Sequence, residues 1–220
     1  MRRAEFEEKS PAREPGIILH FAFPEGKTTR RELSIELTRK SIHLLIAFVP
    51  LIASTSRSLI IALLVSGCTA YALFETLRFN GIRVPIVSEL TERAARLRDT
   101  GKFVSGPITL GLGALFSLIL FGESAAAIAI YVLAFGDGLS SLVGKVFGRL
   151  KLPFTKGKSL AGSLTCFTVS FLSAYAVSAL ALPSLVVALV ATVVEAIPTR
   201  DWDNILLPLA AGLAATILGL

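Results

Sequence analysis

The chain has few of the residues that build metal centres or disulfide frameworks, with two cysteines and two histidines among its 220 residues. Cys68 and Cys166 both lie inside apolar runs, without a CxxC pattern or a neighbouring histidine, and we interpret them as small packing residues. The sequence also contains no HExxH signature. These absences argue against a zinc site and against a disulfide-stapled fold.

Charged residues are scarce as well, at 17% of the chain, whereas hydrophobic residues make up 53% and the mean hydropathy is +0.71. This composition is too apolar for an ordinary soluble domain and predicts an integral membrane protein. The first 30 residues lack the apolar stretch of a cleavable signal peptide. We expect a polar cytoplasmic tail over residues 1–33 and one polytopic membrane domain over residues 34–220.

Apolar segments follow the tail and predict an all-α bundle of about seven transmembrane helices. They lie at about residues 41–55, 58–77, 103–122, 124–146, 159–182, 183–197 and 205–220. Several are shorter than the roughly 20 residues that cross a bilayer without tilt. Small residues such as Gly111, Gly113, Ala114, Gly162 and Ser163 would let these helices approach closely.

The basic residues predict the orientation of this bundle, because Lys and Arg collect in cytoplasmic loops. With the N-terminus inside, every Lys and Arg except Arg57 falls on the cytoplasmic side. The C-terminus is then outside, and the protein is expected to be a multi-pass membrane protein.

One stretch, residues 134–163, combines an acid, several glycines and many cations. Asp137 lies between Gly136 and Gly138, near the end of the fourth apolar segment. An uncompensated carboxylate in a membrane helix costs roughly 2.5–3.5 kcal/mol, and a glycine costs a helix about 1 kcal/mol relative to alanine. The cations that follow are Lys145, Arg149, Lys151, Lys156 and Lys158. Glycines allow close approach to a ligand and cations suit a polyphosphate, so this stretch predicts a nucleotide-phosphate site.

The other unusual polar residues also fall at the predicted cytoplasmic ends of spans. They are Glu36, Arg39, Lys40 and His43 on one helix face before the first span, Glu75 and Arg78 after the second, Lys158 and Ser159 before the fifth, Glu195 after the sixth, and Asp203 and Asn204 before the seventh. The predicted site therefore faces the cytoplasm, where nucleotides are.

Several of these residues have simpler interpretations. Arg39 and Lys40 could be topology anchors, and His43 could be a hydrogen-bonded core histidine. Glu75 and Arg78 could form an interfacial ion pair. The cations after Asp137 could be snorkelling anchors.

The acids suggest metal chemistry, because Asp137, Glu195 and Asp203 come from different spans and oxygen ligands beside a polyphosphate suit Mg²⁺. There is no GxxxxGK[ST] P-loop, although TKGKS resembles its tail. Phosphoryl transfer depends mainly on positioning, charge neutralisation and an aligned acceptor hydroxyl. These residues could supply all three.

Five motifs, taken in order, resemble those of the CTP-dependent membrane lipid kinases, the family of dolichol kinase, phytol kinase and the yeast-type CTP-dependent diacylglycerol kinase. They are ELTRKSIH at residues 36–43, ETLR at 75–78, GDGLSSLVGKVFG at 136–148, KGKSLAGS at 156–163 and EAIPTRDWDNILLP at 195–208. The match covers about residues 34–210, nearly the whole membrane portion.

The resemblance implies transfer of the CTP γ-phosphate to the hydroxyl of a membrane lipid alcohol, such as diacylglycerol, phytol or a polyprenol. It implies a nucleotide site formed by Arg39, Lys40, Gly136, Gly138, Lys145, Lys156, Lys158, Ser159, Gly162 and Asn204. The catalytic candidates are Asp137, Glu195, Asp203 and His43, and the three acids are the candidate Mg²⁺ ligands. Glu36, Glu75 and Arg78 are expected to support this site. No nucleic-acid partner is expected, and the oligomeric state stays open.

Two other functions remain open at this point. Phosphatidate cytidylyltransferase also uses CTP, Mg²⁺ and a membrane lipid, but its HGGxxDR-type signature is absent from this sequence. A small membrane transporter would place polar residues near the midplane and on both faces. The predicted clustering on one face favours the kinase.

Overall fold

The computed structural model describes residues 30–85, 88–89, 91, 101–153, 155 and 157–220. Within these ranges the regular structure is helical, apart from one isolated antiparallel bridge between Lys151 and Ser159. The all-α prediction is therefore confirmed. Residues 1–29 of the predicted tail lie outside the described residues, and so does Lys156.

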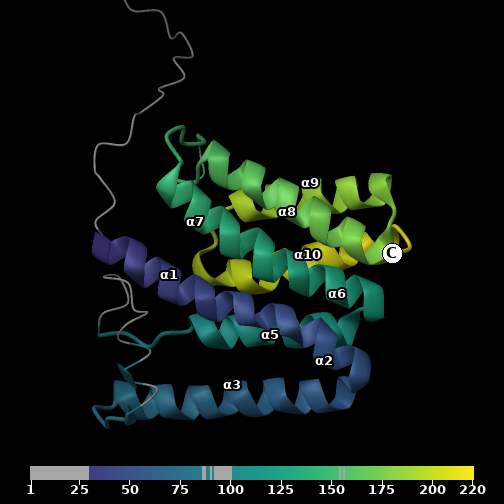
Figure 1. The fold of residues 1–220 in the computed structure, drawn as a ribbon. Helices are drawn as coiled ribbons and strands as arrows, with labels where there is room; N and C mark the ends of the chain where they lie inside the picture. The colour runs from purple at the N-terminus through teal and green to yellow at the C-terminus, as the bar shows by residue number, and fades with distance from the viewer. Residues whose placement is uncertain (1–29, 86–87, 90, 92–100, 154, 156) are drawn as a thin grey trace, which may run out of the picture.

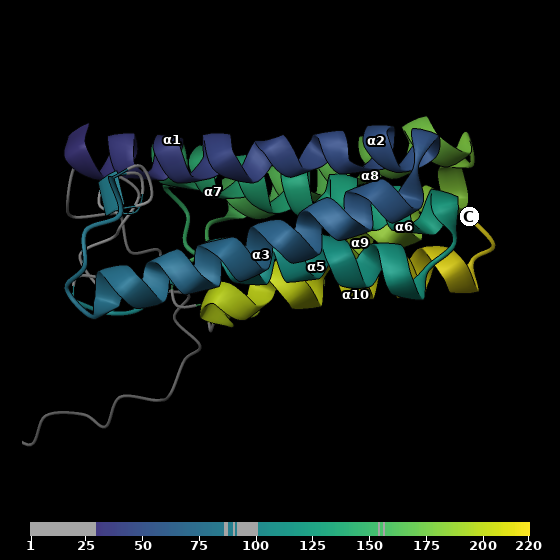
Figure 2. The same cartoon turned by 90° about the horizontal axis from the view of Figure 1, so that it is seen from below.

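The helices run roughly along one common direction (Figures 1 and 2). In chain order they are α1 (Arg30–Leu44), η1 (Leu45–Phe48), α2 (Val49–Thr55), α3 (Arg57–Phe79), α5 (Gly106–Leu120), α6 (Glu123–Tyr131), η3 (Val132–Asp137), α7 (Gly138–Val146), α8 (Leu160–Ser178), α9 (Ala181–Ala196), η4 (Arg200–Trp202) and α10 (Asp203–Ile217). The first predicted span is divided among α1, η1 and α2.

Among the described residues, three helical runs are long and apolar enough to cross a membrane. They are α3 with 23 residues, the continuous run α6–η3–α7 over Glu123–Val146 with 24 residues, and α8 with 19 residues. The apolar helices α5, α9 and α10 are shorter, at 15 or 16 residues.

The α6–η3–α7 run forms the centre of the bundle. In the most apolar 18-residue stretch of this run, 61% of the residues are buried. The corresponding share for α3, which lies at one side of the bundle in Figure 1, is 11%. Ile128, Ile130 and Leu133 on this run are fully buried. The run includes one π-helical segment, η3, which ends at Asp137. The helix continues beyond Asp137 through α7 to Val146, where the predicted fourth segment also ends.

Close helix contacts depend on small residues, as expected. A Cβ atom built at Gly113 of α5 would overlap the backbone carbonyl of Asn204 in α10, and one built at Gly111 would overlap the Cys68 sulfur in α3. At the crossing of α7 and α8, a Cβ at Gly162 would lie 2.9 Å from the Ser140 carbonyl oxygen. These glycines allow backbone-to-backbone packing that larger residues would prevent.

Gly113→Ala is expected to destabilise the protein by about 1–3 kcal/mol, because α5 and α10 would have to separate to accommodate the methyl group. Gly67→Ala is the matched control, since a Cβ at Gly67 in α3 would meet no atom within 4 Å. Thermal unfolding in detergent micelles compares the two variants. Equal melting temperatures would show that the contact between Gly113 and Asn204 does not hold α5 against α10.

Arg57 is the cation that the predicted topology leaves on the outer side, and it has a structural role there. Its guanidinium donates hydrogen bonds to the carbonyl oxygens of Leu118 and of Phe121, the latter at 2.8 Å. Leu118 lies in the last turn of α5, where carbonyl groups have no partner within the helix. Arg57 therefore caps α5 and favourably opposes the negative end of its dipole.

Candidate functional site

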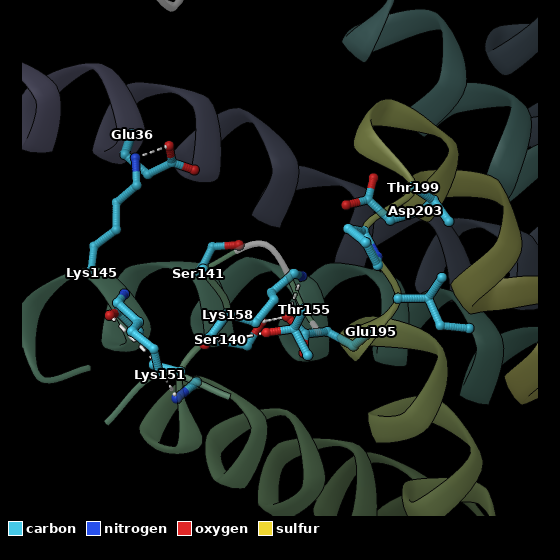
Figure 3. Close-up of a pocket in the computed structure, with 16 residues that line it drawn as sticks. Glu36, Ser140, Ser141, Lys145, Lys151, Thr155, Lys158, Glu195, Thr199 and Asp203 are labelled. Atoms are coloured by element: carbon cyan, nitrogen blue, oxygen red, sulfur yellow. Dashed lines mark hydrogen bonds and ion pairs between the residues drawn. The ribbon is translucent and has the colours of Figure 1, made fainter. Parts of the chain in front are cut away.

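A cavity of about 470 Å³ lies at the end of the bundle where α1, α7, α8, α9 and α10 meet. Figure 3 shows the side chains that converge on it. Its charged lining residues are Glu36, Lys145, Lys151, Lys158, Glu195 and Asp203, and its hydroxyl-bearing ones are Ser140, Ser141, Thr155, Ser159 and Thr199. Three lysines and three acids thus meet in one space.

A tight turn before α8 brings Lys151 and Lys158 to this cavity. The backbone N–H of Leu152 donates to the Lys158 carbonyl at 2.9 Å, and Gly157 adopts a φ of 105°, which an L side chain would strain. Ser159 then caps α8 by accepting a hydrogen bond from the Gly162 N–H at 3.2 Å. Since Ser159 and Gly162 both line the cavity, the positive end of α8 opens onto it, which favours an anion.

The Lys158 ammonium forms an ion pair with Glu195 of α9, with 2.5 Å between Nζ and Oε1. Burial would lower the pKa of Lys158, but the carboxylates of Glu195, Asp137 and Asp203 outweigh it and raise that pKa above its usual value. The other carboxylate oxygen, Oε2 of Glu195, is buried and has no hydrogen-bond partner among the described residues. Such an unsatisfied carboxylate oxygen is costly, which suggests that a ligand completes its coordination.

Glu36 of α1 lies at the other side of the cavity and is fully buried. Its Oε2 accepts a hydrogen bond from Lys145 Nζ of α7 at 2.5 Å, and its Oε1 accepts one from Arg39 at 3.3 Å. The pair between Glu36 and Lys145 therefore ties α1 to α7 where the predicted phosphate site lies. The prediction that Glu36 supports the site agrees with this position.

Asp137 lies behind the cavity wall and does not line it. Its Oδ2 is 2.6 Å from Lys40 Nζ and 3.4 Å from His43 Nε2, and all three side chains are buried. His43 Nε2 also lies 2.8 Å from the Leu133 carbonyl, so we assign the proton to this nitrogen. The Ser140 hydroxyl lies between Asp137 and Glu195. It is 3.3 Å from the backbone carbonyl oxygen of Asp137 and 3.4 Å from Glu195 Oε1.

The structure brings seven predicted site residues to the cavity. They are Glu36, Lys145, Lys158, Ser159, Gly162, Glu195 and Asp203. Lys40, His43 and Asp137 form the neighbouring buried group, whereas Arg39 pairs with Glu36 in the cavity wall.

Other predicted residues have packing contacts away from the cavity. A Cβ at Gly136 would lie 2.9 Å from the Ser170 hydroxyl of α8, and one at Gly138 would lie 3.3 Å from Leu44 of α1. These two glycines therefore permit helix packing, whereas the sequence suggested approach to a ligand. The Asn204 amide donates to Thr109 Oγ1 at 2.9 Å, which joins α10 to α5.

The Glu75 and Arg78 pair also lies apart from the cavity. Arg78 donates two hydrogen bonds to the fully buried Glu75 carboxylate, at 2.6 and 2.7 Å. Glu75 Oε1 also accepts the Val104 N–H at 2.7 Å, and Arg78 donates to the Lys102 carbonyl at 3.0 Å. The pair thus attaches the segment before α5 to the end of α3. This agrees with the simpler interpretation of Glu75 and Arg78 as a structural ion pair.

Several hydroxyl groups of the cavity were not among the residues predicted from the sequence. Ser140 and Ser141 follow Asp137 by three and four residues, so helical spacing could have placed them near it. Thr155 and Thr199 lie in irregular segments, where no periodicity points to them. Lys151, one of the cations of the predicted phosphate-binding stretch and alternatively a membrane anchor, also lines the cavity.

No three His, Cys, Asp or Glu side chains lie close enough to form a metal centre in the part of the chain that the structure describes. Mg²⁺, however, usually binds one or two carboxylates together with substrate phosphates and water. Glu195, with its unsatisfied Oε2, and Asp203 line the same cavity as the lysines. These residues therefore fit Mg²⁺ that arrives with a polyphosphate.

The fold and the cavity define a helical protein with apolar helices of membrane-spanning length and a lysine-lined cavity at one end of its bundle. The chain is 30% identical over 221 residues to probable phytol kinase 1 of Oryza sativa subsp. japonica, covering 88% of this chain and 68% of the relative. It is 29% identical to phytol kinase 1 of Arabidopsis thaliana, covering 90% and 71%, and 29% identical to farnesol kinase of the same plant, covering 83% and 66%. No family model matches the chain. No solved structure matches it either.

The chain belongs to the family of membrane lipid-alcohol kinases that includes these phytol and farnesol kinases. It is a kinase that phosphorylates an alcohol group. The resemblance that the sequence motifs suggested is confirmed.

Proposed function

We propose that this kinase transfers the γ-phosphate of CTP to the hydroxyl of an isoprenoid alcohol in the membrane, such as phytol, and releases CDP. The names of its relatives favour an isoprenoid alcohol over diacylglycerol. The observation that carries the proposal is the cavity beside the N-terminus of α8, in which Lys145 and Lys158 pair with carboxylates and which Lys151 also lines. A polyphosphate needs this combination of positive groups, and phosphoryl transfer needs little else besides alignment.

In this proposal Lys158 exchanges partners when the nucleotide binds. Its ammonium leaves Glu195 for a phosphate oxygen, and the α8 N-terminus with Ser159 binds the phosphate chain. The alcohol oxygen then attacks the γ-phosphorus, and the bond to the β-phosphate oxygen breaks. Asp203, which lines the cavity, accepts the alcohol proton.

We propose Mg²⁺ as the cofactor, which Glu195 would hold together with the phosphates while Asp203 beside it acts as the base. When bound, the ion would neutralise phosphate charge and thereby favour attack by the alcohol. Asp137 lies next to this site, because the Ser140 hydroxyl is 3.3 Å from its backbone carbonyl oxygen and 3.4 Å from Glu195 Oε1, and we retain its carboxylate as a catalytic candidate. Lys40 and His43 would hold its carboxylate in place.

We also propose that the protein crosses the membrane about seven times, with the N-terminus and the active site on the cytoplasmic side. Three runs and three shorter apolar helices support this number, with α1, η1 and α2 together forming the first crossing. The cavity lies at the end of the bundle that carries Lys145, Lys151 and Lys158. The distribution of cations supports the same orientation.

A product assay tests the function. Purified protein in mixed micelles with Mg²⁺ receives γ-labelled CTP or ATP and a panel of phytol, farnesol, a polyprenol and diacylglycerol. We expect label to move from CTP into the isoprenoid alcohols and CDP to accumulate. Release of pyrophosphate with formation of a CDP-lipid from phosphatidate would instead identify a cytidylyltransferase and overturn the proposal.

A further inference from the structure

The central α6–η3–α7 run carries a second cavity near its other end. This outer cavity of about 390 Å³ is lined by residues of α2, α6 and α8, mostly apolar, among them Leu51, Ala127 and Val177. Its polar lining residues are Ser54 and Ser124, and its charged ones are Arg57 and Glu123, the first residues of α3 and α6. The polar cavity described above also includes residues of α1, α7 and α8. Both cavities therefore include residues of the α1–η1–α2 segment, the central α6–η3–α7 run and α8. They lie at opposite ends of the central run.

The surface of the central helix between the two cavities is a narrow apolar stripe. Tyr131, Phe135 and Leu139 are each half-buried, while the residues immediately before and after each of them are buried. The rings of Tyr131 and Phe135 stack, with centroids 6.0 Å apart. In Figure 1 this helix lies between α1 with α2 on one side and α8 on the other. The stripe thus continues from the outer cavity, which Tyr131 lines, towards the polar cavity.

The length of this path suits a lipid chain. From Ala127 in the outer cavity to Ser141 in the polar cavity the helix rises by about 20 Å, at 1.5 Å per residue. The path is longer than half of the hydrocarbon core of a bilayer, which is about 15 Å thick, so only a long hydrocarbon chain would extend from Ser141 to the outer cavity. A chain with its hydroxyl at Ser141 would end in the outer cavity, where Arg57 is already bound to the carbonyls of Leu118 and Phe121.

We propose that the two cavities are the ends of one binding track for the hydrocarbon chain of the alcohol substrate. The inference rests on the proposed function, since a lipid alcohol must present its hydroxyl to the polar cavity. The chain lies over Leu139, Phe135 and Tyr131 and its end enters the outer cavity. The outer cavity therefore limits the chain length that the kinase accepts.

Filling the outer cavity should shorten the preferred substrate. Ala127→Phe on α6 and, separately, Ala53→Phe on α2 are expected to lower kcat/KM for phytol by about tenfold or more, because the end of the chain loses its space. Farnesol is one isoprene unit shorter, and its kcat/KM should change by no more than about twofold. Ala62→Phe, at an exposed position of α3, is the matched control and should leave both substrates unchanged.

Equal losses with phytol and farnesol in both variants, or no loss with either substrate, would overturn the track. A second measurement does not depend on turnover. An isoprenoid alcohol with a photoreactive group at its far end should crosslink to peptides of α2 or α6 in the outer cavity. Crosslinking in the outer cavity without phosphorylation of any alcohol would reject the proposed function and keep the track. Phosphorylation with crosslinks only outside the outer cavity would reject the track and keep the proposed function.

Discussion

Replacing Glu195 by glutamine is expected to lower kcat by about a hundredfold to a thousandfold while the protein stays folded. Glu195 has one carboxylate oxygen on Lys158 and one, Oε2, without a hydrogen-bond partner among the described residues. The variant loses the negative charge that we propose binds Mg²⁺ with the nucleotide. The Lys158 side chain is 27% exposed and can turn towards the cavity, so the loss of its partner should cost little stability.

Glu75→Gln is the matched control for this experiment. Glu75 is also buried, is also paired with a cation, and also lies at a helix end, but it contacts Arg78 and the Val104 N–H instead of the cavity. We expect this variant to lose about 1–3 kcal/mol of stability and to keep its kcat per folded molecule. Initial rates with phytol and CTP, normalised to folded protein by size-exclusion chromatography in detergent, separate the two effects.

A second readout distinguishes loss of the metal from loss of packing. If Glu195 binds Mg²⁺, the Gln variant should need a higher Mg²⁺ concentration for half-maximal rate, whereas the Glu75 variant should show the parental concentration. An unchanged rate in the Glu195 variant would remove this residue from the mechanism. The cavity would then be a phosphate site without its proposed metal ligand.

The sequence predicted the helices and the clustering of polar residues because both depend on local patterns. Apolar runs are long enough to recognise, and Lys158, Ser159 and Glu195 lie at helix ends, where a few residues of sequence decide their place. The cap of α8 by Ser159 follows from the residue type alone. These features place the polar cavity at one end of the bundle.

The partners of the buried charges could not be predicted in the same way. Lys40 and Asp137 are separated by 97 residues, and their contact depends on how α1 packs against the central helix. Gly136 and Gly138 show the same limit, since a glycine beside an acid fits either a ligand or a neighbouring helix. The second oxygen of Glu195 and the outer cavity also require coordinates, because they result from packing between distant segments.

Removing the Asp137 carboxylate alone is expected to destabilise the protein by about 3–5 kcal/mol, because the buried Lys40 ammonium would lose its counter-ion. Lys40 Nζ lies 2.6 Å from Asp137 Oδ2, and each side chain is about 5% exposed. Loss of activity in Asp137→Asn would therefore not separate a catalytic role from a failure to fold. The double variant Lys40→Met with Asp137→Asn removes both charges together, and replacing a buried ion pair in this way is often neutral for stability.

We expect the double variant to unfold at nearly the parental temperature and to turn over at least about a hundredfold more slowly. A buried Lys, His and Asp cluster is expensive within an apolar helix bundle, and an apolar replacement would hold α1 against the central helix equally well. Asp137 lies one helical turn before Ser140, which lines the polar cavity, and this proximity favours a use of the cluster in the reaction. A double variant with parental stability and a parental rate would show instead that Asp137 serves only as the counter-ion of Lys40, and Glu195 and Asp203 would then be the catalytic acids.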